Sequence, residues 1–153
     1  RDLLIGIRPV SWINDNFAII IVLVATLITF FFKLNFKVIK KLLFWTDAFG
    51  IGFFTIVGLQ IALQAGISEG YALIMGVITA TFGGLLADIL CNSVPNLLKP
   101  GELYATACLI GGALYLAMKF FKFNAEISMI VCVLVTAAIR IYSIRKKLML
   151  PVI

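Results

Sequence analysis

The sequence predicts an all-α membrane protein with an internal inverted repeat. Of its 153 residues, 63% are hydrophobic, against about 45–50% in a typical soluble domain, and only 13% are charged. The charged residues lie between long apolar runs, and the net charge of +6 sits at the ends of these runs. This pattern places the apolar runs in lipid, and because no basic stripe occurs, no nucleic-acid partner is expected.

Five apolar segments have the composition of membrane spans. The first is interrupted only by Thr26 and Thr29 and ends at Lys33, and at about 1.5 Å per residue it just crosses a thin bilayer. The second contains Asp47, the glycines Gly50, Gly52 and Gly58 along its length, and two glutamines, which is too polar for a helix facing lipid on all sides. Connections such as residues 66–70 are short and predict antiparallel neighbours. The expected spans are 17–32, 42–67, 71–90, 102–120 and 127–142.

The basic residues predict the orientation of these spans. If five helices cross in turn, one side of the membrane holds Lys33, Lys37, Lys40, Lys41, Lys99, Arg145, Lys146 and Lys147. The other side holds only Arg8, Lys119 and Lys122. By the positive-inside rule the first side is cytoplasmic, and so is the C-terminus.

A repeated motif predicts the inverted repeat. Residues 1–9, RDLLIGIRP, align without gaps on residues 87–95, ADILCNSVP, so that Asp2 matches Asp88 and Pro9 matches Pro95. If the repeat is real, the partners of residues 44–86 precede Arg1, and the natural chain has seven spans, of which the first ones are missing from this fragment. Repeats of three helices enter the membrane from opposite sides, as in many transport proteins.

The expected organisation has three parts. Residues 1–41 are the end of the first three-helix repeat, residues 42–122 are the second repeat, and residues 123–153 are a last transmembrane helix with a basic C-terminus.

The glycine pair Gly83–Gly84, in the third expected span, is the first candidate for a functional site. Glycines destabilise a helix interior by about 1 kcal/mol each, and a break would free backbone groups that only protein or water can satisfy. We therefore expect a helix break that lines an aqueous path, where carbonyl groups attract cations. The alternative is close packing, because Ala72, Gly76, Ala80 and Gly84 recur at every fourth residue.

Carboxylates and hydroxyls near this pair are the further candidates. Asp88 must face protein or water, and it either attracts cations or caps a half-helix or pairs with Arg1. Asp2 is its counterpart in the repeat, and Asp47 lines the pore, reaches the cytoplasmic surface or caps its helix. Thr79 and Thr81 flank the pair and could bind an ion, although such threonines often hydrogen-bond to their own backbone.

Enzymatic chemistry is not expected. The chain has no histidine, and Cys91, Cys108 and Cys132 show no metal-ligand spacing, so neither a nucleophile with its base nor a metal site is indicated. No cofactor is expected.

Three stretches resemble the bacterial trimeric intracellular cation (TRIC) channels, whose sequences are also described as glycine transporters. They read WTDAFGIGFFTIVGLQIAL at 45–63, GVITATFGGLLADILCNSVPNLL at 76–98 and ELYATACLIGGALY at 102–115. The resemblance implies a homotrimer of seven-helix protomers, each with its own pore between glycine-broken second and fifth helices. Residues 71–90 would be the fifth helix, and residues 1–5 the tail of the second. The family motif Gly-Gly-x-x-Arg-Asp is kept in part by Arg1–Asp2, but the second copy reads Ala87–Asp88.

The sequence and the resemblance together favour a cation channel that passes potassium through each protomer. The pore-lining or gating residues would be Gly83, Gly84, Thr79, Thr81, Asp88, Arg1, Asp2 and Asp47. The alternatives are a secondary transporter of a small zwitterion such as glycine, which would share the fold, and a structural subunit. We expect an integral protein of the bacterial inner membrane, surrounded by membrane lipid.

Overall fold

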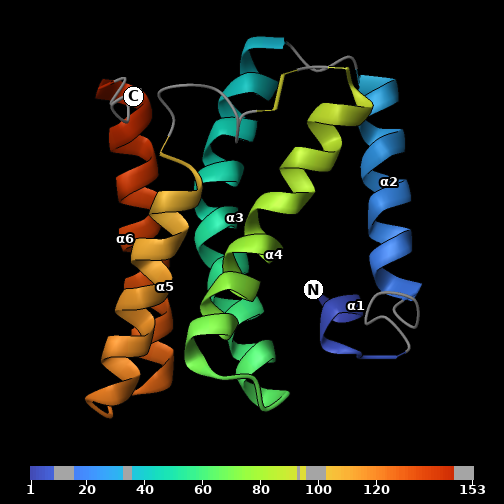
Figure 1. Ribbon diagram of the computed structural model, residues 1–153. Coiled ribbons are helices and arrows are strands. Elements are labelled where there is room, and N and C mark those ends of the chain that lie inside the picture. Colours follow the sequence, from blue (N-terminus) through green and yellow to red (C-terminus); the bar gives the residue numbers. More distant parts are fainter. Residues whose placement is uncertain (9–15, 33–35, 93, 96–102, 147–153) are drawn as a thin grey trace. The chain divides into compact units, whose positions relative to one another are not determined.

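The computed structural model describes residues 1–8, 16–32, 36–92, 94–95 and 103–146. In these residues all regular structure is α-helical, as expected, and Figure 1 shows the helices in order along the chain. The six helices are α1 (Asp2–Ile5), α2 (Asn16–Phe32), α3 (Phe36–Gln64), α4 (Glu69–Leu90), α5 (Ala105–Phe120) and α6 (Ala125–Lys146).

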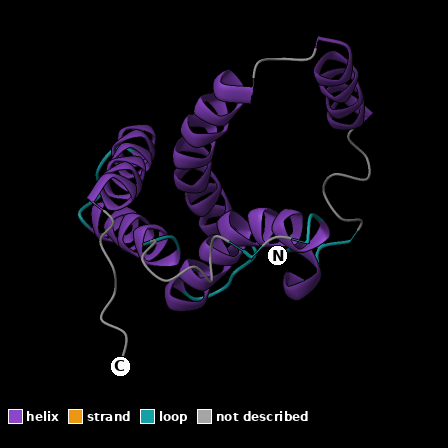
Figure 2. Cartoon of the chain, turned by 90° about the horizontal axis from the view of Figure 1, so that it is seen from above, coloured by secondary structure: helices purple, strands orange, loops and turns teal. Residues whose placement is uncertain are grey.

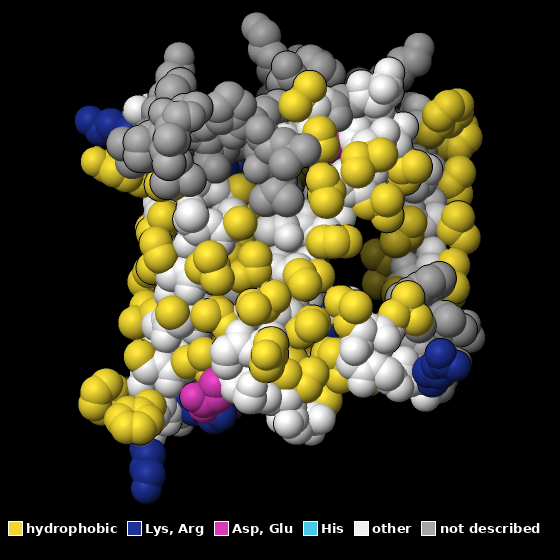
Figure 3. Space-filling view, in the orientation of Figure 1, with side chains coloured by type: hydrophobic (Ala, Val, Ile, Leu, Met, Phe, Trp, Pro, Cys, Tyr) yellow, Lys and Arg dark blue, Asp and Glu magenta, His cyan; other side chains and the backbone are white. Residues whose placement is uncertain are grey.

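Each expected span coincides with a helix of suitable composition. Among the described residues, three segments are long and apolar enough to cross a membrane, namely Lys41–Gln64, Glu69–Leu90 and Ala125–Lys146. Two shorter apolar helices, Phe17–Phe31 and Ala105–Phe120, match the first and fourth expected spans. Figure 3 shows many hydrophobic side chains exposed along the described helices, which suits a surface that faces lipid.

The chain divides into two compact units, Arg1–Trp45 and Thr46–Ile153, and each is described by itself. In the first unit, α1 ends at Gly6, whose φ of 78° is a left-handed conformation that glycine adopts without strain. Arg1 donates a hydrogen bond from Nε to Oδ1 of Asp2 over 2.6 Å, and Asp2 is buried. The expected three-part division of the chain stays a prediction.

In the second unit, helices pack closely at small residues. A Cβ atom on Gly76 of α4 would lie 2.5 Å from the carbonyl oxygen of Thr55 on α3, and one on Gly52 would lie 2.9 Å from that of Val133 on α6. Ala72 and Ala80, which flank Gly76 at fourth-residue spacing, are buried. The packing interpretation of this stripe is therefore confirmed for its first three members.

Helix α5 packs in the same way inside the protomer, beside α6 in both Figure 1 and Figure 2. A Cβ atom on Gly111 would meet Thr136 of α6, and one on Gly112 would meet Leu73 of α4. A Gly-Gly pair on a helix can serve a contact between copies of a chain, but here both glycines are buried by helices of the same protomer.

The expected break at Gly83–Gly84 is not present. Helix α4 is continuous from Glu69 to Leu90, and the glycines with positive φ among the described residues are Gly6 and Gly66. Figure 1 shows α4 bending in its C-terminal half instead. A glycine pair weakens a helix without forcing its hydrogen bonds to open, so a bend is the smaller response to the same sequence feature.

Candidate functional site

A cavity with charged and hydroxyl groups in its wall lies in the second unit, beside the C-terminal half of α4. Its volume is about 90 Å³, and it combines two carboxylates with two hydroxyls. The lining residues are Asp47 from α3, Thr81, Gly84, Leu85, Ala87 and Asp88 from α4, and Tyr104, which immediately precedes α5. Four of the sequence-predicted residues, Gly84, Thr81, Asp88 and Asp47, are thus brought together.

The α4 residues meet at the cavity because of helical periodicity. Thr81, Gly84 and Asp88 are separated by three and four residues, so they share one face of the helix. Thr79 lies on another face, where it packs against Gly58 of α3. Gly83 also points elsewhere, since a Cβ atom added to it would have no neighbour within 4 Å.

The hydroxyls of Thr79 and Thr81 each donate a hydrogen bond to a backbone carbonyl of α4. Thr79 Oγ1 donates to the carbonyl oxygen of Met75 over 2.7 Å, and Thr81 Oγ1 donates to that of Val77 over 2.8 Å. The backbone-bonding alternative is therefore confirmed for both. The oxygen of Thr81, a residue that lines the cavity, can still accept a hydrogen bond, because a hydroxyl that donates once keeps its acceptor capacity.

Asp88 lies in the last turn of α4, close to its end at Leu90. The cap expected for a half-helix that begins after Gly84 is therefore absent, because α4 does not restart there. A carboxylate at a helix C-terminus faces the negative end of the helix dipole, which destabilises the carboxylate unless a positive charge is nearby.

The expected pair Arg1 and Asp2 lies in the first unit, where the two residues interact with each other. Their part in a pore stays a prediction.

Gly84 leaves room for the hydroxyl of Tyr104. A Cβ atom at Gly84 would lie 3.4 Å from Tyr104 Oη, which is the lower limit of an ordinary contact. Tyr104 itself is buried, and its hydroxyl donates a hydrogen bond to Oδ1 of Asp47 over 3.1 Å. Gly84 and Tyr104 thus lie in contact at the cavity wall, where the tyrosine meets the Asp47 carboxylate.

Arg140 of α6 completes this arrangement and was not predicted from the sequence. Its Nη2 atom lies 3.7 Å from Oδ2 of Asp47, and its guanidinium carbon lies 4.5 Å from the centre of the Tyr104 ring. The Arg140 side chain is 3% exposed, whereas that of Asp47 is 43% exposed. The signal that could have identified it is an arginine inside an apolar span, since ionised residues there usually face protein or water and serve a function.

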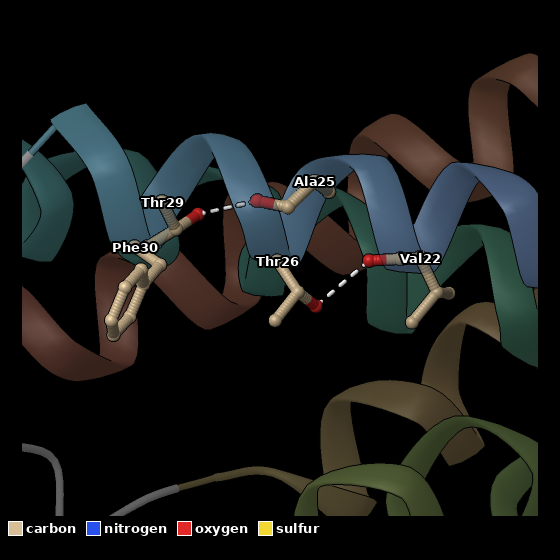
Figure 4. Close-up of a pocket in the computed structure, with 5 residues that line it drawn as sticks. All are labelled: Val22, Ala25, Thr26, Thr29 and Phe30. Atoms are coloured by element: carbon tan, nitrogen blue, oxygen red, sulfur yellow. Dashed lines mark hydrogen bonds between the residues drawn. The ribbon is translucent and has the colours of Figure 1, made fainter.

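A second hollow lies along one face of α2, in the first unit, and is lined by Val22, Ala25, Thr26, Thr29 and Phe30 (Figure 4). Thr26 Oγ1 donates to the carbonyl oxygen of Val22 and Thr29 Oγ1 to that of Ala25, each over 2.8 Å. The hollow is mainly apolar, and its described lining residues carry no charge.

Comparisons with known proteins show the family to which this chain is similar. A family model described as "Glycine transporter" matches residues 44–119. The UPF0126 inner membrane protein YadS of Escherichia coli strain K12 is 32% identical over 99% of this chain and 73% of its own length. A UPF0126 membrane protein of Vibrio cholerae is 34% identical over 99% of this chain and 63% of its own length.

Solved structures of TRIC channels are similar to this chain in both fold and sequence. A structure of TRIC cation channels has a TM-score of 0.86 and 33% identity, covering 99% of this chain and 74% of the channel chain. The TRIC trimeric intracellular cation channel orthologue from Rhodobacter sphaeroides has a TM-score of 0.87 and 33% identity, covering 96% and 75% of the two chains. This chain belongs to the bacterial TRIC channel family.

As a TRIC family member, the chain has solved neighbours that are ion channels and not enzymes, and its E. coli relative is named as an inner membrane protein. It spans less than two thirds of the Vibrio cholerae relative. Within the described residues, no three His, Cys, Asp or Glu side chains gather as metal ligands. Ala87, at the position where the resemblance implied an arginine, is one of the residues that line the cavity.

Proposed function

We propose that this protein is a cation channel in which each protomer of a homotrimer passes monovalent cations, potassium above all. The observation that carries the proposal is the position of two carboxylates, Asp47 and Asp88, in a cavity beside the bend of α4, in a chain similar to TRIC cation channels. The path runs along the face of α4 that holds Thr81 and Gly84.

The cavity chemistry supports this proposal. Carboxylate and hydroxyl oxygens replace the water that a cation loses, and a volume of about 90 Å³ holds several water molecules beside it. Because Asp88 lies near the negative end of α4, the helix dipole and the carboxylate both favour a cation and disfavour an anion. Conduction then depends on charge and on open space next to Gly84.

The test is single-channel recording of the full-length protein in planar bilayers. Asp88→Asn keeps the shape of the side chain and removes its charge, so it lowers potassium conductance or weakens selectivity over chloride. Gly84→Leu fills the cavity and blocks conduction. Glu126→Gln is the matched control, because it removes an exposed carboxylate from the first turn of α6, away from the cavity.

Each outcome discriminates between functions. If Asp88→Asn and Gly84→Leu assemble and conduct like the parent, the cavity does not belong to the path. If the parent carries no potassium current but shows glycine flux that saturates with concentration, the protein is a carrier, the function named in the matching family model.

The membrane and assembly features belong to the same proposal. The protein sits in the inner membrane with its C-terminus in the cytoplasm, and three copies associate through helix packing, each with its own path. The support is the charge asymmetry of the sequence and the trimeric orthologue among its structural neighbours.

A further inference from the structure

Arg140 is a buried charge on the last helix of the chain. A guanidinium keeps its proton in proteins, so burying it requires partners that offset its charge. Arg140 as a whole is only 2% exposed to solvent. It lies in the C-terminal half of α6, a helix that is apolar over most of its length. A neutral side chain of similar size would pack there without this electrostatic penalty.

Two partners of Arg140 are groups that line the cavity. Asp47 faces it with Oδ2 at 3.7 Å from Nη2, while Oδ1 of the same carboxylate accepts the hydrogen bond from Tyr104. The guanidinium lies over the Tyr104 ring at 4.5 Å from the centroid, close enough for a cation–π interaction. Both oxygens of Asp47 are therefore engaged, one by a charge and one by a hydroxyl, from two other segments of the chain.

The positive charge of Arg140 beside Asp47 changes the electrostatic potential in the cavity. Asp47 and Asp88 both line it, but Arg140 offsets the charge of the first, so an entering cation is attracted by less than the full charge of two carboxylates. A conducting site must bind an ion well enough for entry and weakly enough for exit. Without this counter-charge, the two carboxylates of the cavity would favour retention of the ion over its release.

We propose that Arg140 is a positioning and affinity-setting residue of the cation path, which holds Asp47 against Tyr104 and acts as a fixed counter-charge that weakens cation binding in the cavity. This inference rests on the proposed channel function. It assigns a role in ion affinity to α6, which the sequence places outside the three-helix repeats.

The experiment is a double-mutant cycle on the full-length protein in planar bilayers. The readout is the potassium concentration that gives half-maximal single-channel conductance, because a purely structural role of Arg140 would not move it in a charge-dependent direction. The variants are Arg140→Gln, Asp47→Asn, their combination, and Arg140→Lys.

Arg140→Gln removes the counter-charge, so the half-saturating concentration falls by about threefold or more and the maximal conductance decreases. Asp47→Asn removes the carboxylate that faces the guanidinium and keeps the positive charge, so the half-saturating concentration rises. The double variant removes both charges and returns the value toward that of the parent. Arg140→Lys keeps the charge and restores most of the parent behaviour, although it loses the flat surface that stacks on Tyr104.

Several results would overturn the inference. One is a half-saturating concentration that rises or stays unchanged in Arg140→Gln, and another is a double variant that behaves like Asp47→Asn alone. If Arg140→Gln fails to assemble, the comparison of Asp47→Asn with the double variant still decides, since only a counter-charge makes the double variant bind potassium more tightly.

If the protein is not a channel, the result differs from a failure of the role given to Arg140, because the parent then carries no potassium current at all. If the parent conducts and Asp88→Asn reduces its current, while the Arg140 and Asp47 variants leave the half-saturating concentration unchanged, only the role of Arg140 is refuted.

Discussion

Two glycines on α4 respond in opposite ways to the same substitution, alanine. At Gly76 a new Cβ atom would lie 2.5 Å from the carbonyl oxygen of Thr55, about 1 Å closer than an ordinary contact of ~3.5 Å. The backbone oxygen cannot rotate away, so α3 and α4 must move apart. Overpacking of this kind costs about 1–3 kcal/mol, and a full backbone clash belongs at the upper end of that range. Alanine regains about 1 kcal/mol of helix propensity, which leaves a net destabilisation of about 2 kcal/mol.

At Gly83 the same change is stabilising. The added Cβ atom has no neighbour within 4 Å, so the gain of up to about 1 kcal/mol in helix propensity is not offset. For a protein of this size, 1 kcal/mol corresponds to about 2–4 °C in Tm. We therefore expect Gly76→Ala to lower the Tm by about 4–8 °C and Gly83→Ala to raise it by about 2–4 °C.

The assay is the Tm of the full-length protein in detergent, followed as the loss of the folded oligomer on size exclusion after heating. Expression level and detergent are kept the same for both variants and the parent. If Gly76→Ala is as stable as Gly83→Ala, the close approach of α3 and α4 at this point is wrong, and the packing interpretation of the small-residue stripe fails with it.

Three further predictions test the orientation, the cavity lining and the assembly. A cysteine placed at Lys146 stays shielded from an impermeant thiol reagent added outside intact cells, whereas one at Lys122 reacts; the opposite pattern reverses the orientation. Thr81→Val removes an oxygen from the cavity wall and lowers potassium conductance by about two- to tenfold, in keeping with the loss of one ion–dipole contact, while Thr79→Val, on the face toward Gly58, leaves conductance at the parent level. The detergent-solubilised protein has the mass of three chains by light scattering, and a monomer or dimer that conducts would refute the trimer.

The sequence by itself determined the class of the protein and the position of its helices. Apolar runs of about the length of a bilayer must form helices, because lipid offers no partner for free backbone groups. The stripe of Ala72, Gly76 and Ala80 was predictable for a similar local reason, since residues four apart on a helix share a face. The same rule places Thr81 and Asp88 together, away from Thr79, before any neighbour of the helix is known.

Only the tertiary structure decided what these faces meet. Asp47, Tyr104 and Arg140 are far apart in the chain and come from three different segments, so no local spacing relates them. The sequence also misled at Gly83–Gly84, where a break was expected and α4 continues through a bend. Helix geometry depends on residues within a few positions of each other, whereas the partners of a buried charge are chosen by packing between helices, where the penalty for an unopposed charge selects the arrangement that pairs it.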